Sequence, residues 1–194
     1  CRTSPDVSAA VPTVYWDSTD YNLMKTFDMN CRRPENTKPG GFNDMDALML
    51  TGGLSDVENV SYFTIFCMEA SPLMLSVDLP NIDDRTLEII SNAEVIAINQ
   101  DPVCHQAVKV SEDKPGLQVW KKVLVDDNGK KSRAVMLFNR SEEAAEITAR
   151  FADADLPSVC SIRDLWEHKD KGIYKDEYTA PVPAHGVVLI KAVG

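Results

Sequence analysis

The chain has 194 residues, of which 20 are Lys or Arg and 30 are Asp or Glu, giving a formal net charge of -10. This negative balance argues against a nucleic-acid partner, which needs a basic surface, and gives no attraction to anionic membranes. The apolar fraction of 44% is that of an ordinary globular protein, and the most apolar stretch, residues 62–77, is too short to span a bilayer. We therefore predict neither a nucleic-acid nor a membrane partner.

The first part of the chain is rich in turn-forming residues and leads to one short apolar run. Apolar positions within residues 20–29 fit a helix, and residues 13–16 fit a brief strand or the start of a helix. Residues 39–53 open on Pro-Gly-Gly, continue through Asn-Asp-Met-Asp into an apolar run, and end on Gly-Gly. Turn residues followed by such a run predict a strand that enters a core.

Helical and strand-like patterns alternate between residues 55 and 102. Broad apolar faces, preceded by capping candidates such as Ser55 and Asp83, predict helices. Helices are expected over residues 55–68 and 83–90, and a short helix or turn is expected over residues 93–99. Residues 73–77 predict a short buried strand between the first two helices. This alternation is typical of an α/β fold.

The pattern changes after Pro102, where short alternating stretches recur at regular spacing between turn signals. Such spacing is typical of antiparallel β structure. We predict strands over residues 117–124, 134–138, 146–151, 159–165, 174–180 and 187–192. Residues 126–129, Asp-Asp-Asn-Gly, are a hairpin signal, and further turns are expected at residues 171–172 and 183–186. The chain is therefore expected to be α/β first and all-β afterwards.

Few residues point to chemistry from the pattern alone. Asp6, Asp44 and Asp46 are carboxylates beside predicted strand ends, and Arg2 is placed to hold an anionic or hydroxyl-rich partner. A pair of carboxylates across a pocket is the minimum for glycoside hydrolysis. The same atoms can instead bind a divalent cation or form an Asx-rich turn. Because the chain has no EF-hand spacing and no zinc-type cluster, we predict neither a metal nor a cofactor.

The cysteines and the glycosylation sequons give an indication of the cellular compartment of the protein. The five cysteines are widely spread, and their odd number allows at most two internal disulfides. Residues 59–61, Asn-Val-Ser, and residues 139–141, Asn-Arg-Ser, are N-glycosylation sequons. These features favour a secreted glycoprotein or one in a lysosomal, vacuolar or periplasmic compartment.

Three segments of the chain carry a family pattern. Residues 1–7 are Cys-Arg-Thr-Ser-Pro-Asp-Val, residues 40–46 are Gly-Gly-Phe-Asn-Asp-Met-Asp, and residues 94–102 are Glu-Val-Ile-Ala-Ile-Asn-Gln-Asp-Pro. They resemble the W-R-T-x-x-D-I, G-G/H-W-N-D-P-D-M and E-V-I-A-V-N-Q-D-P segments of glycoside hydrolase family 27, the α-galactosidases and their relatives. The order of the segments and the closing residues 182–188 agree as well, so the resemblance runs from end to end.

The resemblance implies both a fold and a site. Family members have a (β/α)8 barrel followed by an antiparallel β domain, which makes residues 1–103 the last strands and helices of a barrel and residues 104–194 a β-sandwich. Asp6 corresponds to the general acid/base, Arg2 to an arginine that contacts sugar hydroxyls, and Asp46 to an acid that helps to form the sugar pocket. The implied activity is retaining hydrolysis of terminal α-galactosyl residues on a carbohydrate substrate, without a cofactor.

The chain also departs from the family. The family's nucleophile lies in a K-x-D segment on an earlier barrel strand that we do not find, and a whole barrel takes about 250 residues. We therefore expect this chain to be inactive alone and to need an N-terminal barrel half from the same precursor or from a partner chain. Ala47 stands in place of a pocket methionine. This leaves α-N-acetylgalactosaminides, β-L-arabinopyranosides and α-glucans as alternative substrates. A non-catalytic carbohydrate-binding or structural protein, and a homo-oligomer, also stay open.

Overall fold

The first half of the described chain is built mainly from helices. The computed structural model describes residues 2, 6–7, 14–17 and 22–194, so the beginnings of the elements predicted over residues 13–16 and 20–29 lie outside it. The helices are α1 (Leu23–Asn30), α2 (Asp56–Met68), α3 (Asp84–Ile90) and α4 (Ala93–Asn99), with 3-10 turns η1 (Pro34–Asn36) and η2 (Leu79–Asn81). The helices expected from the sequence are confirmed, with small shifts at their ends. Among the described residues, no helix is long and apolar enough to cross a membrane.

Side-chain caps explain where these four α-helices begin. Ser55 precedes α2 and forms a capping box with Glu58. Its Oγ accepts the Glu58 N–H at 3.3 Å, and the Glu58 carboxylate accepts the Ser55 N–H at 2.8 Å. Asn22, Asp83 and Asn92 accept backbone N–H bonds at the starts of α1, α3 and α4. These caps satisfy N–H groups that have no partner within a helix.

The strands predicted in the first half are present only as single parallel bridges among the described residues. Arg2 pairs with Asp44, and Leu48 pairs with Leu75. The expectation of a buried strand over residues 73–77 is wrong in its burial, because Met74 and Leu75 are 63% and 40% exposed. A parallel strand is buried when neighbouring elements cover both its faces. Among the described residues, the bridge that pairs this segment with a neighbour joins Leu75 to Leu48.

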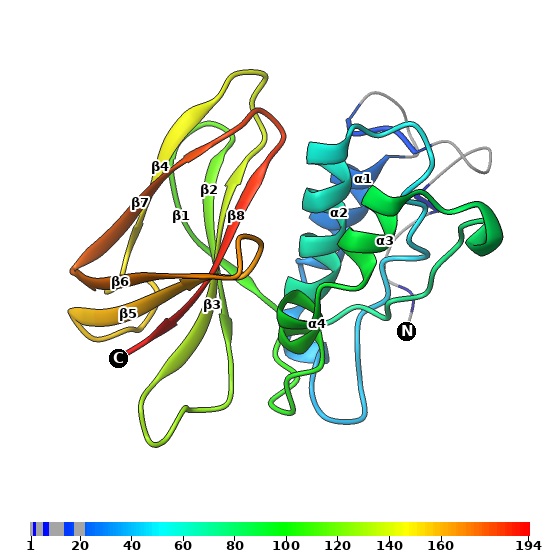
Figure 1. Ribbon diagram of the computed structural model, residues 1–194. Helices are drawn as coiled ribbons and strands as arrows, with labels where there is room; N and C mark the ends of the chain where they lie inside the picture. Colours follow the sequence, from blue (N-terminus) through cyan, green and yellow to red (C-terminus); the bar gives the residue numbers. More distant parts are fainter. Residues whose placement is uncertain (1, 3–5, 8–13, 18–21) are drawn as a thin grey trace.

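The second half of the chain folds as an antiparallel β-sandwich, as predicted. Its larger sheet has the strand order β1-β2-β3-β8-β5-β6, and its smaller sheet pairs β4 with β7. The strands are β1 (Val108–Lys114), β2 (Leu117–Val123), β3 (Ser132–Asn139), β4 (Ala145–Arg150), β5 (Val159–Asp164), β6 (Lys169–Lys175), β7 (Glu177–Val182) and β8 (Val187–Val193). Figure 1 shows both sheets on one side of the molecule and the helices on the other.

Two details of the β half differ from the sequence prediction. β1 is absent from that prediction because it is an edge strand whose residues are all exposed or half-buried, so no buried alternation marks it. Residues 174–180 divide into β6 and β7 at Asp176, whose φ of 65° lies in the left-handed region and breaks the strand. The turn expected at residues 171–172 is also wrong, since Gly172 pairs with Ile162 inside β6 and the chain turns at residues 165–168.

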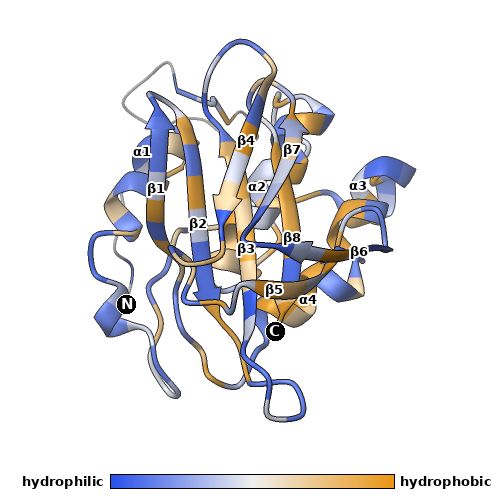
Figure 2. Ribbon diagram, turned by 90° about the vertical axis from the view of Figure 1, so that its left-hand side faces the viewer, coloured by the Kyte–Doolittle hydropathy of each residue, from blue (hydrophilic) through white to orange (hydrophobic). Residues whose placement is uncertain are grey.

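The larger sheet is covered on both faces. One face packs on the helices, where Phe27 of α1 lies between Trp120 and Phe138 with ring centroids 4.8 and 6.1 Å away. The other face packs on the smaller sheet through apolar residues such as Val135 and Ile147. Figure 2, which looks onto the sandwich, shows apolar residues along β3 and β8 in the middle of the larger sheet. β3 is buried at every position, as expected for a strand covered on both sides.

Candidate functional site

One backbone bridge and a set of side-chain contacts bring the three predicted site residues together. The parallel bridge between Arg2 and Asp44 places the segment that carries Asp6 beside the segment that carries Asp46. The Nη2 atom of Arg2 lies 2.6 Å from Asp6 Oδ1 and 2.7 Å from Asp46 Oδ2. Both carboxylates therefore share one guanidinium nitrogen, and the positive charge of Arg2 offsets the repulsion between them.

The three side chains differ in exposure. The side chain of Asp6 is 66% exposed, that of Arg2 39% and that of Asp46 19%. Asp46 Oδ2 also accepts the backbone N–H of Val7 at 3.0 Å. Asp46 is thus fixed to both segments, whereas Asp6 presents its carboxylate to solvent. Acceptors and a five-donor guanidinium in one place suit a ligand with several hydroxyl groups.

The turn that carries Asp46 has an uncommon backbone conformation. Asp46 has a φ of 82°, in the left-handed region that residues other than glycine rarely adopt. Its N–H donates to Asp44 Oδ1 at 2.9 Å, and the Tyr62 hydroxyl of α2 donates to the carbonyl of Ala47 at 2.6 Å. Burial raises the pKa of Tyr62, and the nearby negative charge of Asp46 adds to the rise. Asp44, a candidate carboxylate from the sequence, thus supports the turn, and Tyr62 is a contributor that sequence reasoning missed.

The residues just before Asp46 are held by buried polar groups. Asn43 is 1% exposed and donates from Nδ2 to the Arg33 carbonyl at 2.8 Å and to Gln106 Oε1 at 2.7 Å. The N–H of Met45 donates to Ser71 Oγ at 2.9 Å. These contacts satisfy polar groups that are removed from water. The asparagine of the Gly-Gly-Phe-Asn-Asp segment therefore shapes the loop instead of facing the site.

A second cluster of titratable side chains ties the helices to the sandwich. His185, in the turn before β8, lies within hydrogen-bond distance of Glu58 at 2.8 Å and Glu142 at 3.2 Å, and its ring stacks on Trp16 with centroids 4.7 Å apart. Burial raises the pKa of Glu58, but bonds from the Ser55 backbone and from His185 outweigh it and leave a lowered pKa. Within the described part of the chain, no group of three or more His, Cys, Asp or Glu side chains is arranged to hold a metal ion.

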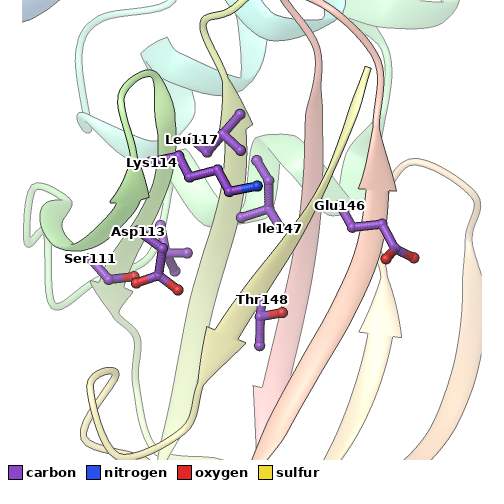
Figure 3. A pocket seen from close by; sticks show the side chains of 8 residues that line it. Ser111, Asp113, Lys114, Leu117, Glu146, Ile147 and Thr148 are labelled. Carbon is purple, nitrogen blue, oxygen red and sulfur yellow. The ribbon is translucent and has the colours of Figure 1, made fainter. Parts of the chain in front are cut away.

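The sandwich has a cleft at its open side, between β1 and β4. It has a volume of about 140 Å³ and is lined by residues of β1, β2 and β4. Figure 3 shows Ser111 and Asp113 of β1 on one side and Thr148 of β4 on the other, with Glu146 pointing away from them. Asp113 is bound by Arg150 at 2.9 Å, so this carboxylate forms an ion pair. The cleft therefore lacks the arrangement of two facing acids with an arginine that Asp6, Asp46 and Arg2 form.

The glycosylation sequons are buried in the fold. Asn59 is 6% exposed, and Asn139 is fully buried and donates from Nδ2 to the carbonyls of Glu143 and Val182 at 2.8 and 3.1 Å. An N-linked glycan needs a side chain at the surface, so neither asparagine can carry one in this fold. The cysteines within the described residues, Cys31, Cys67, Cys104 and Cys160, are unpaired. A location outside the cytosol stays a prediction, and the sequons no longer support it.

Comparisons with known proteins give two family models that together account for most of the chain. Residues 13–101 match the model described as alpha galactosidase A, and residues 114–192 match the alpha galactosidase C-terminal beta sandwich domain. Among curated proteins, alpha-galactosidase 2 of Arabidopsis thaliana is 39% identical over 161 residues. The probable alpha-galactosidase of Dictyostelium discoideum is 37% identical over 195 residues. These alignments cover 81% and 97% of this chain.

A solved structure agrees with these matches. Alpha-galactosidase I from Mortierella vinacea superimposes with a TM-score of 0.85 and 32% sequence identity, over 98% of this chain and 52% of that one. The chain spans 39% of the Arabidopsis relative and 47% of the Dictyostelium relative. It therefore corresponds to about half the length of the proteins that it matches.

Proposed function

The chain belongs to glycoside hydrolase family 27, of which it is a C-terminal region, and from this membership we propose that it is part of a retaining exo-α-galactosidase. In this proposal Asp6 is the general acid/base, and Arg2 and Asp46 bind the sugar. The observation that carries the proposal is the convergence of both carboxylates on one Arg2 nitrogen, at 2.6 and 2.7 Å. Retaining enzymes use two carboxyl groups about 5–5.5 Å apart, one as acid/base and one as nucleophile, and in this proposal Asp46 is not the nucleophile.

The exposures fit these roles. Asp46 is the least exposed of the three side chains and is held by Arg2 and by the Val7 N–H, which suits a residue that orients a sugar. Asp6 is the most exposed, which suits a group that must reach the glycosidic oxygen and then a water molecule. The Arg2–Asp6 contact occupies one carboxylate oxygen of Asp6. We propose that sugar hydroxyls take the place of Asp6 on Arg2 and so free that oxygen.

The proposed reaction has two steps. In the first, the carboxylic acid of Asp6 gives its proton to the leaving oxygen as a second carboxylate attacks the anomeric carbon, so the glycosidic bond breaks and a glycosyl-enzyme forms. In the second, the Asp6 carboxylate takes a proton from water, and the resulting hydroxide displaces the enzyme carboxylate from the sugar. We propose that the second carboxylate comes from the N-terminal part of the barrel, in the same precursor or in a partner chain.

Substitution of Asp6 by asparagine in the full-length protein tests the role of the acid/base. The variant is expected to hydrolyse melibiose about 10³-fold more slowly, because the leaving group of melibiose is a sugar alcohol that needs a proton to depart. Cleavage of 4-nitrophenyl α-galactoside should suffer less in its first step, because the phenolate leaves without protonation. Azide should then restore turnover and give α-galactosyl azide, since azide attacks the glycosyl-enzyme without a general base.

A matched control separates chemistry from folding. Asp126→Asn changes an exposed acid in the β2–β3 hairpin and should leave both substrates unaffected. If Asp6→Asn slows melibiose and 4-nitrophenyl α-galactoside equally, and azide yields no galactosyl azide, Asp6 is not the acid/base. Absence of galactoside hydrolysis by the unaltered full-length protein would instead contradict the proposed substrate.

A further inference from the structure

The backbone at Asp46 is held in a conformation that few residues other than glycine adopt. A φ of 82° is strained for residues other than glycine and persists only where the surroundings impose it. The carboxylate of this residue is also the group that meets Arg2 at 2.7 Å. The strained backbone and the candidate sugar-binding carboxylate therefore belong to the same residue.

Contacts on both sides of Asp46 impose this conformation. On the N-terminal side, Asp44 Oδ1 accepts the Asp46 N–H at 2.9 Å. On the C-terminal side, the Tyr62 hydroxyl donates to the carbonyl of Ala47 at 2.6 Å. Two residues further along, Leu48 exchanges backbone bonds of 2.8 Å with the segment that contains Leu75. The peptide group between Ala47 and Leu48, one residue beyond Asp46, is thus fixed by a helix side chain, and Leu48 itself is fixed by a strand-like bridge.

The surroundings of Tyr62 restrict its side chain and so restrict the Ala47 carbonyl to which its hydroxyl donates. It lies on α2, is fully buried, and packs its ring edge-on against Phe66 with centroids 5.2 Å apart. A buried phenol that lacks a partner is costly, so its hydroxyl has a strong preference for the Ala47 carbonyl. Because α2 begins at a capping box and packs against the sheet, it offers a rigid base for this contact.

We propose that Tyr62 is a positioning residue of the sugar site, which holds the left-handed Asp46 turn so that its carboxylate lies against Arg2. The expected effect on sugar binding rests on the proposed function, in which Asp46 binds the sugar. Tyr62 acts through Asp46 and not through Asp6. Its loss is therefore expected to weaken galactose binding more than it slows proton transfer.

The chain offers a matched control one residue away. Ser61 lies on the same helix, is fully buried, and its hydroxyl also donates a 2.6 Å bond to a backbone carbonyl, that of His185 in the sandwich. Tyr62→Phe and Ser61→Ala each delete one buried hydroxyl from α2. Both should lower the melting temperature of the full-length protein, but only Tyr62→Phe should disturb the site.

The measurements are galactose inhibition, steady-state kinetics on 4-nitrophenyl α-galactoside, and crystal structures of both variants without ligand. For Tyr62→Phe we expect the inhibition constant of galactose and KM to rise about tenfold, with kcat changed less than about threefold. In its structure Asp46 should leave the positive φ region or lose its contact with Arg2. Ser61→Ala should keep the site geometry and stay within about twofold of the unaltered protein.

The coordinates decide the proposal independently of the sugar. If Asp46 and Arg2 are unmoved in Tyr62→Phe, or if Ser61→Ala alters the site equally, Tyr62 is not a positioning residue. If the unaltered protein neither binds galactose nor cleaves a galactoside, the proposed function fails, and the structure of Tyr62→Phe still shows whether the turn depends on this hydroxyl.

Discussion

Replacement of Glu69 by glutamine should remove a pH dependence from the stability of the fold. Glu69 follows the last residue of α2 and is fully buried between the helices and the larger sheet. Its Oε2 accepts a bond from Asn30 Nδ2 at 2.8 Å, while Oε1 has no hydrogen-bond partner among the described residues. Burial raises the pKa of Glu69 from 4.5 to about 8, against the opposing effects of Asn30 and Lys122.

The sign and size of the effect follow from the two pKa values. An acid whose pKa is raised in the folded state stabilises the fold fully below the unfolded pKa of 4.5, and this contribution is lost as pH rises through about 8. Each pH unit within that window is worth about 1.4 kcal/mol, so between pH 5 and pH 7 the free energy of unfolding should fall by roughly 2.5 kcal/mol.

A buried lysine in the same region changes stability in a different pH range. Lys122 is fully buried and donates from Nζ to the Cys67 carbonyl at 2.9 Å. Burial lowers the pKa of Lys122 from 10.5 to about 8. For a base with a lowered pKa, the stabilisation is present above 10.5 and is lost as pH falls through about 8. Measurements between pH 5 and pH 7 therefore report Glu69 and not Lys122.

The assay is thermal and urea unfolding of the full-length protein and of Glu69→Gln at pH 5, 6 and 7. A glutamine keeps an acceptor for Asn30 without a titratable group, so the variant should gain relative stability as pH rises, by roughly 2.5 kcal/mol across the range. Glu88→Gln, which alters a 69% exposed carboxylate on α3, is the control and should follow the unaltered protein. A stability difference between Glu69→Gln and the unaltered protein that is the same at pH 5 and pH 7 would refute the reasoning.

Two further predictions concern the helices and the sequons. Ser55→Ala removes the Oγ that caps α2, and it should cost about 1 kcal/mol of unfolding free energy in urea, whereas Ser55→Gly should cost less than half of that. An equal cost for both variants would contradict a capping role. Asn139 is fully buried and donates both of its amide hydrogens, so it should carry no glycan. Treatment with peptide-N-glycosidase should therefore leave the intact mass of the folded protein unchanged. Asn139→Asp should change that mass only by the difference between the two side chains. A loss of mass on enzymatic treatment would show that one of the sequons is used.

The elements that the sequence predicts well are those whose pattern is local. α2 has an apolar face and a capping residue directly before it, and β3 contains a continuous apolar run over residues 134–138. β1 could not be found in this way, because an edge strand is defined by its neighbour β2 and not by its own burial. The break between β6 and β7 depends on one left-handed residue, Asp176, whose identity allows that conformation without demanding it.

The site shows the same division. A family motif locates Arg2, Asp6 and Asp46, and the structure brings these three side chains together, yet the motif says nothing of what holds them. Tyr62 lies sixteen positions beyond Asp46 on a helix whose apolar face accounts for it fully as a core residue. The signal available in the sequence is that a buried tyrosine needs a partner for its hydroxyl, and only the fold identifies that partner.

The identity of residue 46 is itself an argument for a role in binding. A glycine would take a φ of 82° without strain, so the backbone alone favours glycine at this position. The chain has an aspartate there instead, with its carboxylate bound by the Arg2 guanidinium and the Val7 N–H. Those bonds, together with the contacts from Asp44 and Tyr62, offset the strain. A turn that uses four contacts to hold an acid in a glycine conformation fits the sugar-binding role proposed for that acid, and this is why the consequences of Tyr62→Phe should be sought in sugar binding.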